Sequence, residues 1–150
     1  MVAADTNGGV AVKTPVHLWI VGVLALLWNF IGVFDYVASK FNLEFYLSQF
    51  EPEMLDAVNA MPAWATASWA FGVWGAFVGT IGLLLRKKWA LWAYVASIGG
   101  LLLSNIYSFF LSNAAEAMGE SYPYMNALIW VIAIGLFLYA RAMSNKGVLS

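Results

Sequence analysis

Cysteine is absent from the 150-residue chain, and histidine occurs once, at His17. Without cysteine the protein has no disulfide, no thiol redox relay and no thiolate-bound metal. One histidine excludes a haem held by two histidines of one chain. His17 has no carboxylates near it in the sequence, so it is a poor metal ligand and is better explained as a polar anchor at the membrane interface. We therefore expect neither a metal nor a cofactor.

Charge is also scarce, because Asp, Glu, Lys and Arg make up 10% of the chain whereas hydrophobic residues make up 63%. The net charge of -1 and the scattered basic residues exclude a nucleic-acid partner. The sequence has no Ser/His/Asp arrangement, no paired carboxylates within its apolar segments, no GxGxxG fingerprint and no P-loop. We therefore expect that the protein is not an enzyme.

Long apolar runs are what the chain does contain. Four of them cover about residues 16–37, 63–85, 89–112 and 122–142. Each is roughly 20 residues long, the length of helix that crosses the ~30 Å hydrocarbon core of a bilayer. The sequence therefore predicts an all-α fold: an integral membrane, four-helix antiparallel bundle that forms a single domain over residues 1–150.

The loops between these runs separate the charges by sign. Lys13, Arg86, Lys87, Lys88, Arg141 and Lys146 fall on one side of a four-span arrangement; Glu44, Glu51, Glu53, Asp56, Glu116 and Glu120 fall on the other side, with Lys40. Basic residues near the ends of spans mark the cytoplasmic side. Both termini are therefore expected in the cytoplasm.

The loop between the first two spans carries an amphipathic segment. Pro52 suits the first turn of a helix, and Met54, Leu55, Val58 and Met61 then share one face. This short outer-loop helix is expected to lie on the membrane surface, either as a simple connector or as a cover over a cavity. The segments up to Gly9 and from Ser144 to Ser150 are expected to be mobile tails.

Small residues recur every three or four positions within the spans. The helix-packing candidates on the second and third spans are Gly72, Gly75, Gly79, Gly82 and Gly100. Lipid provides no hydrophobic drive for helix association, so helices gain contact where small residues let the backbones approach. Gly75 and Gly79 form a GxxxG pair that suits either a homodimer or packing within the chain; the second is favoured because the hairpin partner is tethered next to it.

Polar residues within the spans are the main functional lead. The candidates for lining a ligand site are Asn29, Asp35, Ser68, Asn105 and Asn126, all expected in the outer half of the membrane. They either form hydrogen bonds between helices, the usual role of intramembrane Asn and Ser, or line an outward-opening polar pocket. Asp35 is the strongest candidate for function because ionisable residues within spans are rare.

Five segments carry a resemblance to known proteins. They are Gly32-Val33-Phe34-Asp35-Tyr36, Tyr46-Leu47-Ser48-Gln49-Phe50, Pro62-Ala63-Trp64, the run from Trp69 to Gly75 and the run from Leu83 to Ala90. With these segments the chain resembles a group of small, uncharacterised four-span bacterial membrane proteins, some of which are automatically labelled sugar transporters. The resemblance implies a four-helix fold in the bacterial inner membrane, and it assigns no binding residues.

Three classes of function remain, of which a membrane enzyme or cofactor carrier is disfavoured because the sequence offers no set of ligand residues. The first is a small integral-membrane accessory or assembly protein, surrounded by membrane lipid, that packs against a larger membrane protein or against a second copy of itself. The alternative is an oligomeric small-solute transporter or ligand-binding membrane protein with a polar pocket in its outer half. The chain resembles small multidrug exporters in size and span number, but those use an acidic residue deep in the first span, where this chain has Asn29.

Overall fold

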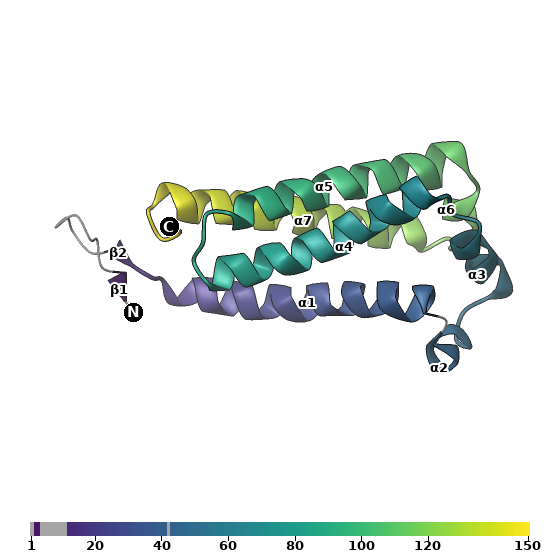
Figure 1. Cartoon of the computed structure of the whole chain (residues 1–150), viewed down its shortest axis with the longest axis horizontal. Coiled ribbons are helices and arrows are strands. Elements are labelled where there is room, and N and C mark those ends of the chain that lie inside the picture. Colours follow the sequence, from purple (N-terminus) through teal and green to yellow (C-terminus); the bar gives the residue numbers. More distant parts are fainter. Residues whose placement is uncertain (1, 4–11, 42) are drawn as a thin grey trace.

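The computed structural model describes residues 2–3, 12–41 and 43–150, and four long helices dominate it (Figure 1). They are α1 (Val16–Lys40), α4 (Ala63–Leu84), α5 (Ala90–Ile106) with its π-helical continuation η1 (Tyr107–Leu111), and α7 (Tyr122–Asn145). Each is long and apolar enough to cross a membrane. The prediction of an all-α, four-span membrane bundle is confirmed.

Short elements connect the long helices. They are α2 (Glu44–Leu47), α3 (Pro52–Asn59), α6 (Ala114–Ala117) and an antiparallel pair of two-residue strands, β1 (Val2–Ala3) and β2 (Val12–Lys13). The predicted amphipathic loop helix is α3, with Pro52 in its first turn. Ala57 of α3 packs against Ala65, Tyr107 and Ala114, so the apolar side of the helix covers this end of the bundle.

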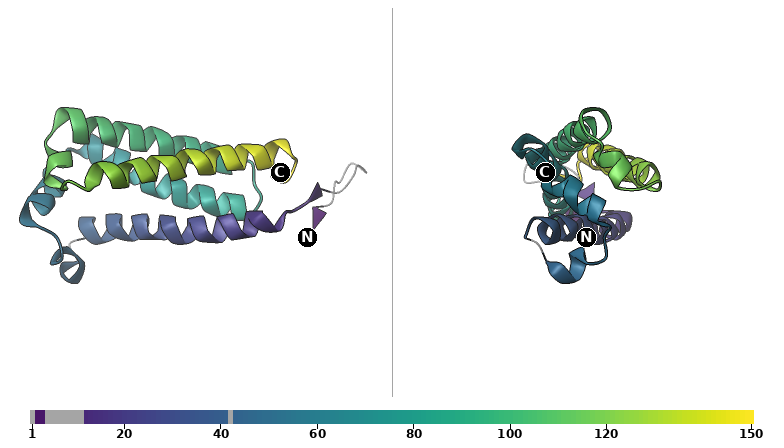
Figure 2. Two further views of the ribbon diagram at one scale, coloured as in Figure 1. Left: turned by 180° about the vertical axis from the view of Figure 1, so that it is seen from behind. Right: turned by 90° about the vertical axis from the view of Figure 1, so that its right-hand side faces the viewer.

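The α4–α5 hairpin is the centre of the bundle. α1 packs against α4 and α7 packs against α5. In Figure 1 α1 lies below the hairpin and α7 lies behind it, and the reverse view in Figure 2 shows α7 in front. Close approach of α4 and α5 depends on glycine: a β-carbon on Gly75 would lie 3.0 Å from the Ala93 carbonyl oxygen, and one on Gly79 would lie 3.0 Å from the Tyr94 ring. Both glycines of the GxxxG pair therefore face a helix of the same chain.

The other packing candidates lie in the same interface. A β-carbon on Gly82 would meet the Trp89 ring at 2.7 Å, and one on Gly100 would meet the Ser68 carbonyl oxygen at 2.5 Å. Gly72 has ordinary contact with Leu101, and its own carbonyl oxygen accepts a 2.6 Å hydrogen bond from Ser97 Oγ. All five predicted glycines thus lie where α4 and α5 meet.

Charge divides the molecule into two ends, since α1, α4, α5 and α7 alternate in direction (Figure 1). The basic end carries Lys13, Arg86, Lys87, Lys88, Arg141 and Lys146, six of the seven Lys and Arg residues. The acidic end, formed by α2, α3, α6 and the neighbouring helix ends, carries Asp35, Glu44, Glu51, Glu53, Asp56, Glu116 and Glu120, with Lys40. Within the described ranges, no Asp or Glu side chain lies at the basic end.

The segment from Ser144 to Ser150 does not behave as predicted. α7 continues to Asn145, and Val148 and Leu149, 4% and 1% exposed, join the main apolar core together with Leu18 and Leu83. Ser150 N donates to Arg86 O at 2.9 Å, and Lys88 N donates to Ser150 O at 3.0 Å. The prediction of a mobile tail was wrong because two apolar side chains and two backbone hydrogen bonds fix this segment. Most of the predicted N-terminal tail, residues 4–9, lies outside the described ranges.

Candidate functional site

A polar group of three side chains, Asn29, Thr80 and Tyr94, lies in the bundle core. Thr80 Oγ1 donates to the Ala76 carbonyl oxygen at 2.9 Å and accepts from Asn29 Nδ2 at 2.8 Å. Because the Thr80 proton is used on Ala76, the Tyr94 hydroxyl must be the donor in its 2.8 Å hydrogen bond with Thr80. One threonine therefore joins α1, α4 and α5, and its hydroxyl has no remaining capacity for a ligand.

A second polar group connects α5 to α7. Asn105 Oδ1 accepts from Asn126 Nδ2 at 2.6 Å and from Trp130 Nε1 at 3.0 Å. All three side chains are half-buried. The two asparagines that were expected to line a pocket are thus brought together, but they bond to each other.

Asp35 lies near the end of α1 and accepts a hydrogen bond from the Tyr46 hydroxyl. Tyr46 in turn contacts the Phe34 and Phe50 rings edge to face, so the carboxylate and an aromatic cluster hold α2 against α1. Burial, followed by the hydrogen bond and the negative charge of Asp35, raises the pKa of Tyr46. This tyrosine remains protonated at neutral pH and keeps donating to Asp35.

The five predicted pocket residues do not meet at one place. Asn29 bonds to Thr80, Asp35 bonds to Tyr46, and Ser68 Oγ donates to the Trp64 carbonyl oxygen of its own helix at 2.8 Å. Only Asn105 and Asn126 contact one another. Every buried side-chain nitrogen or oxygen of the described residues has a hydrogen-bond partner. Apart from Ser68, the predicted pocket residues thus connect different chain segments.

Sequence reasoning did not select Thr80, Tyr94 or Trp130 as members of these groups. Thr80 stands alone in an apolar run, and Tyr94 lies one helical turn inside α5 instead of at its very end. Each of these positions stands out in the sequence as a polar residue in an apolar helix. Their hydrogen-bond partners could not be predicted, because pairing depends on how far neighbouring helices are displaced along one another.

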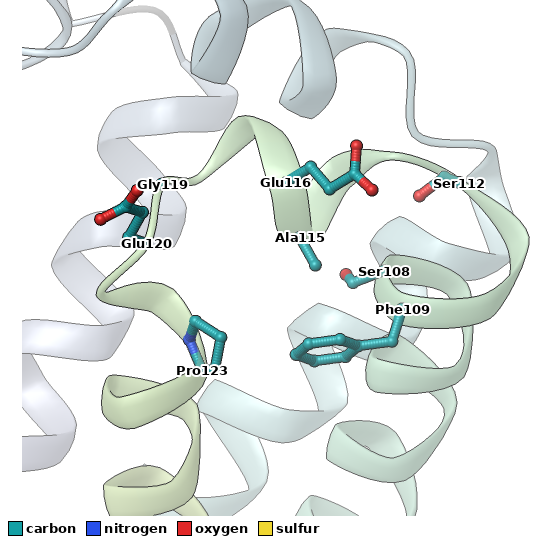
Figure 3. A pocket seen from close by; sticks show the side chains of 8 residues that line it. All are labelled: Ser108, Phe109, Ser112, Ala115, Glu116, Gly119, Glu120 and Pro123. Atoms are coloured by element: carbon teal, nitrogen blue, oxygen red, sulfur yellow. The ribbon is translucent and has the colours of Figure 1, made fainter.

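The acidic end has an open depression of about 480 Å³ (Figure 3). It is lined by Ser108, Phe109, Ser112, Ala115, Glu116, Gly119, Glu120 and Pro123. η1 supplies Ser108 and Phe109, and the two glutamates lie on opposite sides of the hollow in Figure 3. Both glutamates are exposed to solvent. None of Asn29, Asp35, Ser68, Asn105 and Asn126 lines this depression.

No three His, Asp or Glu side chains among the residues that the structure describes are grouped to hold a metal ion. His17, predicted to be an interfacial anchor, is hydrogen-bonded to the Tyr139 hydroxyl and so joins α1 to α7.

Comparison of the chain with protein-family models, with curated proteins and with solved structures gives no match. The geometry of the polar groups is therefore the basis for a functional proposal.

Proposed function

We propose that the protein is a small, non-enzymatic accessory or assembly protein of the bacterial inner membrane, which packs against a larger membrane protein or a second copy of itself. The observation that carries the proposal is the pairing of polar groups within the spans. Asn29, Asp35, Ser68, Asn105 and Asn126 all bond to other groups of the same chain. A bundle whose polar groups are satisfied internally interacts with other molecules mainly through its outer surface.

The position in the membrane follows from the distribution of charge. Six basic residues gather at one end, and such residues are retained on the cytoplasmic side. We therefore place both termini and Lys87 in the cytoplasm and Glu53 and Glu116 outside the inner membrane. The proposed bacterial source rests on the resemblance of the segments around Asp35, Pro62 and Arg86 to small four-span bacterial membrane proteins.

Photo-crosslinking in native membranes tests for a partner. A photoreactive amino acid would replace Leu27 on α1, Leu103 on α5 or Val131 on α7, each of which is exposed on the outside of the bundle. We expect at least one position to give a discrete crosslinked product with a single protein, because a partner covers one face at a defined register. The same photoreactive amino acid at Glu53, a solvent-exposed position on α3, is the control for random collision. Crosslinks to lipid alone at all three positions would contradict the proposal.

A solute-binding or transport role is the second candidate, and the depression beside Glu116 and Glu120 favours it. Four helices rarely enclose a path for a solute, so transport would require several copies. A panel of sugars, amines and quinones distinguishes the two roles through ligand-induced shifts in melting temperature. A shift that disappears in Asp35→Asn or Glu116→Gln would replace the accessory role with solute binding.

A further inference from the structure

Two helices finish at the basic end with the same hydrogen-bond pattern. After α7, Gly147 N donates to Ser144 O at 3.0 Å and Val148 N donates to Met143 O at 2.9 Å. After α4, Arg86 N donates to Leu83 O at 3.0 Å and Lys87 N donates to Gly82 O at 2.9 Å. Both sets are the paired bonds of a Schellman motif, which places one residue in the left-handed backbone conformation.

The residue in the left-handed position differs between the two motifs. α7 uses Gly147, with φ of 79°, whereas α4 uses Arg86, with φ of 59°. Glycine occupies this conformation without steric cost, but a β-carbon there approaches the following carbonyl oxygen. Arg86 is the one non-glycine residue with positive φ in the described part of the chain. A side chain kept at a disfavoured position points to a role for that side chain.

The Arg86 guanidinium makes one hydrogen bond to the described residues. Nη1 donates to Thr14 Oγ1 at 3.1 Å, and Thr14 is buried just before α1. Arginine has five N–H donors, so most of them have no hydrogen-bond partner in the described structure. Lys13 directly precedes Thr14 in the chain, so four cationic residues, Lys13 and Arg86 to Lys88, lie near this turn at the basic end.

Among the described residues, this turn carries an excess of positive charge. No Asp or Glu side chain of the described residues lies at the basic end, and a terminal carboxylate at Ser150 would offset only one of the positive charges. Trp89 follows the turn and is exposed, as expected of an aromatic residue at the interface. A guanidinium presents parallel N–H groups that match the oxygens of a phosphate. At the membrane interface, where basic residues near span ends are expected to lie, lipid headgroups are the abundant source of phosphate.

We propose that the turn formed by Arg86, Lys87 and Lys88, together with Lys13, binds the phosphate headgroup of an anionic phospholipid. The proposal rests on the membrane location of the bundle and not on the accessory role. A general excess of basic residues requires no fixed side chain. The left-handed Arg86 and its bond to Thr14 distinguish a built site from such an excess.

Arg86→Gly is the decisive variant, because glycine suits the left-handed backbone and the fold should be retained. Binding would be measured by native mass spectrometry of the detergent-solubilised protein, titrated with phosphatidylglycerol or with phosphatidylcholine of the same acyl chains. We expect the wild type to prefer phosphatidylglycerol. Loss of one positive charge at the membrane surface should weaken that binding roughly fivefold to tenfold, with no change in binding of phosphatidylcholine.

Lys40→Gln is the matched control, since Lys40 is the one basic residue at the acidic end. It should leave the preference for phosphatidylglycerol unchanged, whereas Lys87→Gln combined with Lys88→Gln should reduce it. Equal binding of the two lipids by the wild type, or an unchanged preference in Arg86→Gly, would overturn the proposal while leaving the accessory role intact. Displacement of the lipid by millimolar inorganic phosphate would overturn the assignment to a lipid and indicate a soluble phosphate ligand.

Discussion

One methyl group added at Gly100 should destabilise the bundle by about 1–3 kcal/mol, the usual cost of forcing extra atoms into a packed interface. A β-carbon at this position would lie 2.5 Å from the Ser68 carbonyl oxygen and 2.7 Å from Gly72 N. Both are backbone atoms, which cannot move aside as a flexible side chain would. Gly100→Ala must therefore push α5 away from α4, and this also weakens the hydrogen bond from Ser97 to the Gly72 carbonyl oxygen.

Gly99→Ala is a matched control one residue away in the same helix. A β-carbon on Gly99 meets no atom within 4 Å. Both substitutions gain the same helix propensity, about 1 kcal/mol, so only the packing term differs between them. Thermal unfolding in one detergent should show Gly99→Ala melting at or above the wild-type temperature and Gly100→Ala well below it. Equal melting of the two variants would show that α4 and α5 are not in close contact at Gly100.

Thr80→Val should have the second large effect, a loss of about 1–2 kcal/mol, within the range for leaving a buried polar group unpaired. Valine keeps the shape of threonine but removes the oxygen that accepts from Asn29 and Tyr94. Asn29 retains its 3.2 Å hydrogen bond to the Ala76 carbonyl oxygen. The Tyr94 hydroxyl, in a residue that is 1% exposed, loses its described partner, and this loss dominates the cost.

A double-mutant cycle with Tyr94→Phe isolates the interaction energy between the Thr80 and Tyr94 side chains. Tyr94→Phe alone should cost less than Thr80→Val, because Thr80 still bonds to Asn29 and Ala76. Once the tyrosine hydroxyl is absent, Thr80→Val should cost less than it does in the wild type. Tyr124→Phe, at an 80% exposed position, should leave melting unchanged. Strictly additive losses for Thr80→Val and Tyr94→Phe would show that the two side chains do not interact.

The four spans and the α4–α5 interface could be predicted because both leave a local pattern. Apolar runs of membrane length define the helices, and small residues at three- and four-residue spacing identify the face on which Gly75 and Gly79 lie. The amphipathic helix beginning at Pro52 was predictable for the same reason. Such features depend only on residues that are close together in the sequence.

The grouping of the polar residues could not be predicted because it depends on the register between helices. Asn29 and Asn105 both suggested an outer pocket, yet one bonds across to Thr80 and the other to Asn126. The prediction for the C-terminal segment was wrong for a related reason. Val148 and Leu149 are only two apolar residues, and their burial requires a space between α1, α4 and α5 that no local pattern reveals.

The left-handed conformation of Arg86 could not be predicted from the sequence for a different reason. The Arg86-Lys87-Lys88 sequence predicts a cytoplasmic turn, and the structure adds that Arg86 adopts a conformation normally filled by glycine. A sequence rule for helix ends looks for glycine and therefore passes over an arginine. The exception becomes visible only when the α4 end is compared with the α7 end at Gly147.

Membrane topology is the central claim, and single-cysteine labelling tests it most directly because the wild-type chain contains no cysteine. Lys87→Cys at the basic end and Glu53→Cys at the acidic end are both at exposed positions. A membrane-impermeant maleimide would be applied to bacterial cells that express the protein, with the outer membrane opened and the inner membrane intact. We predict labelling of Glu53→Cys in these cells, and labelling of Lys87→Cys only after the inner membrane is permeabilised. Labelling of Lys87→Cys while the inner membrane is intact would contradict the topology.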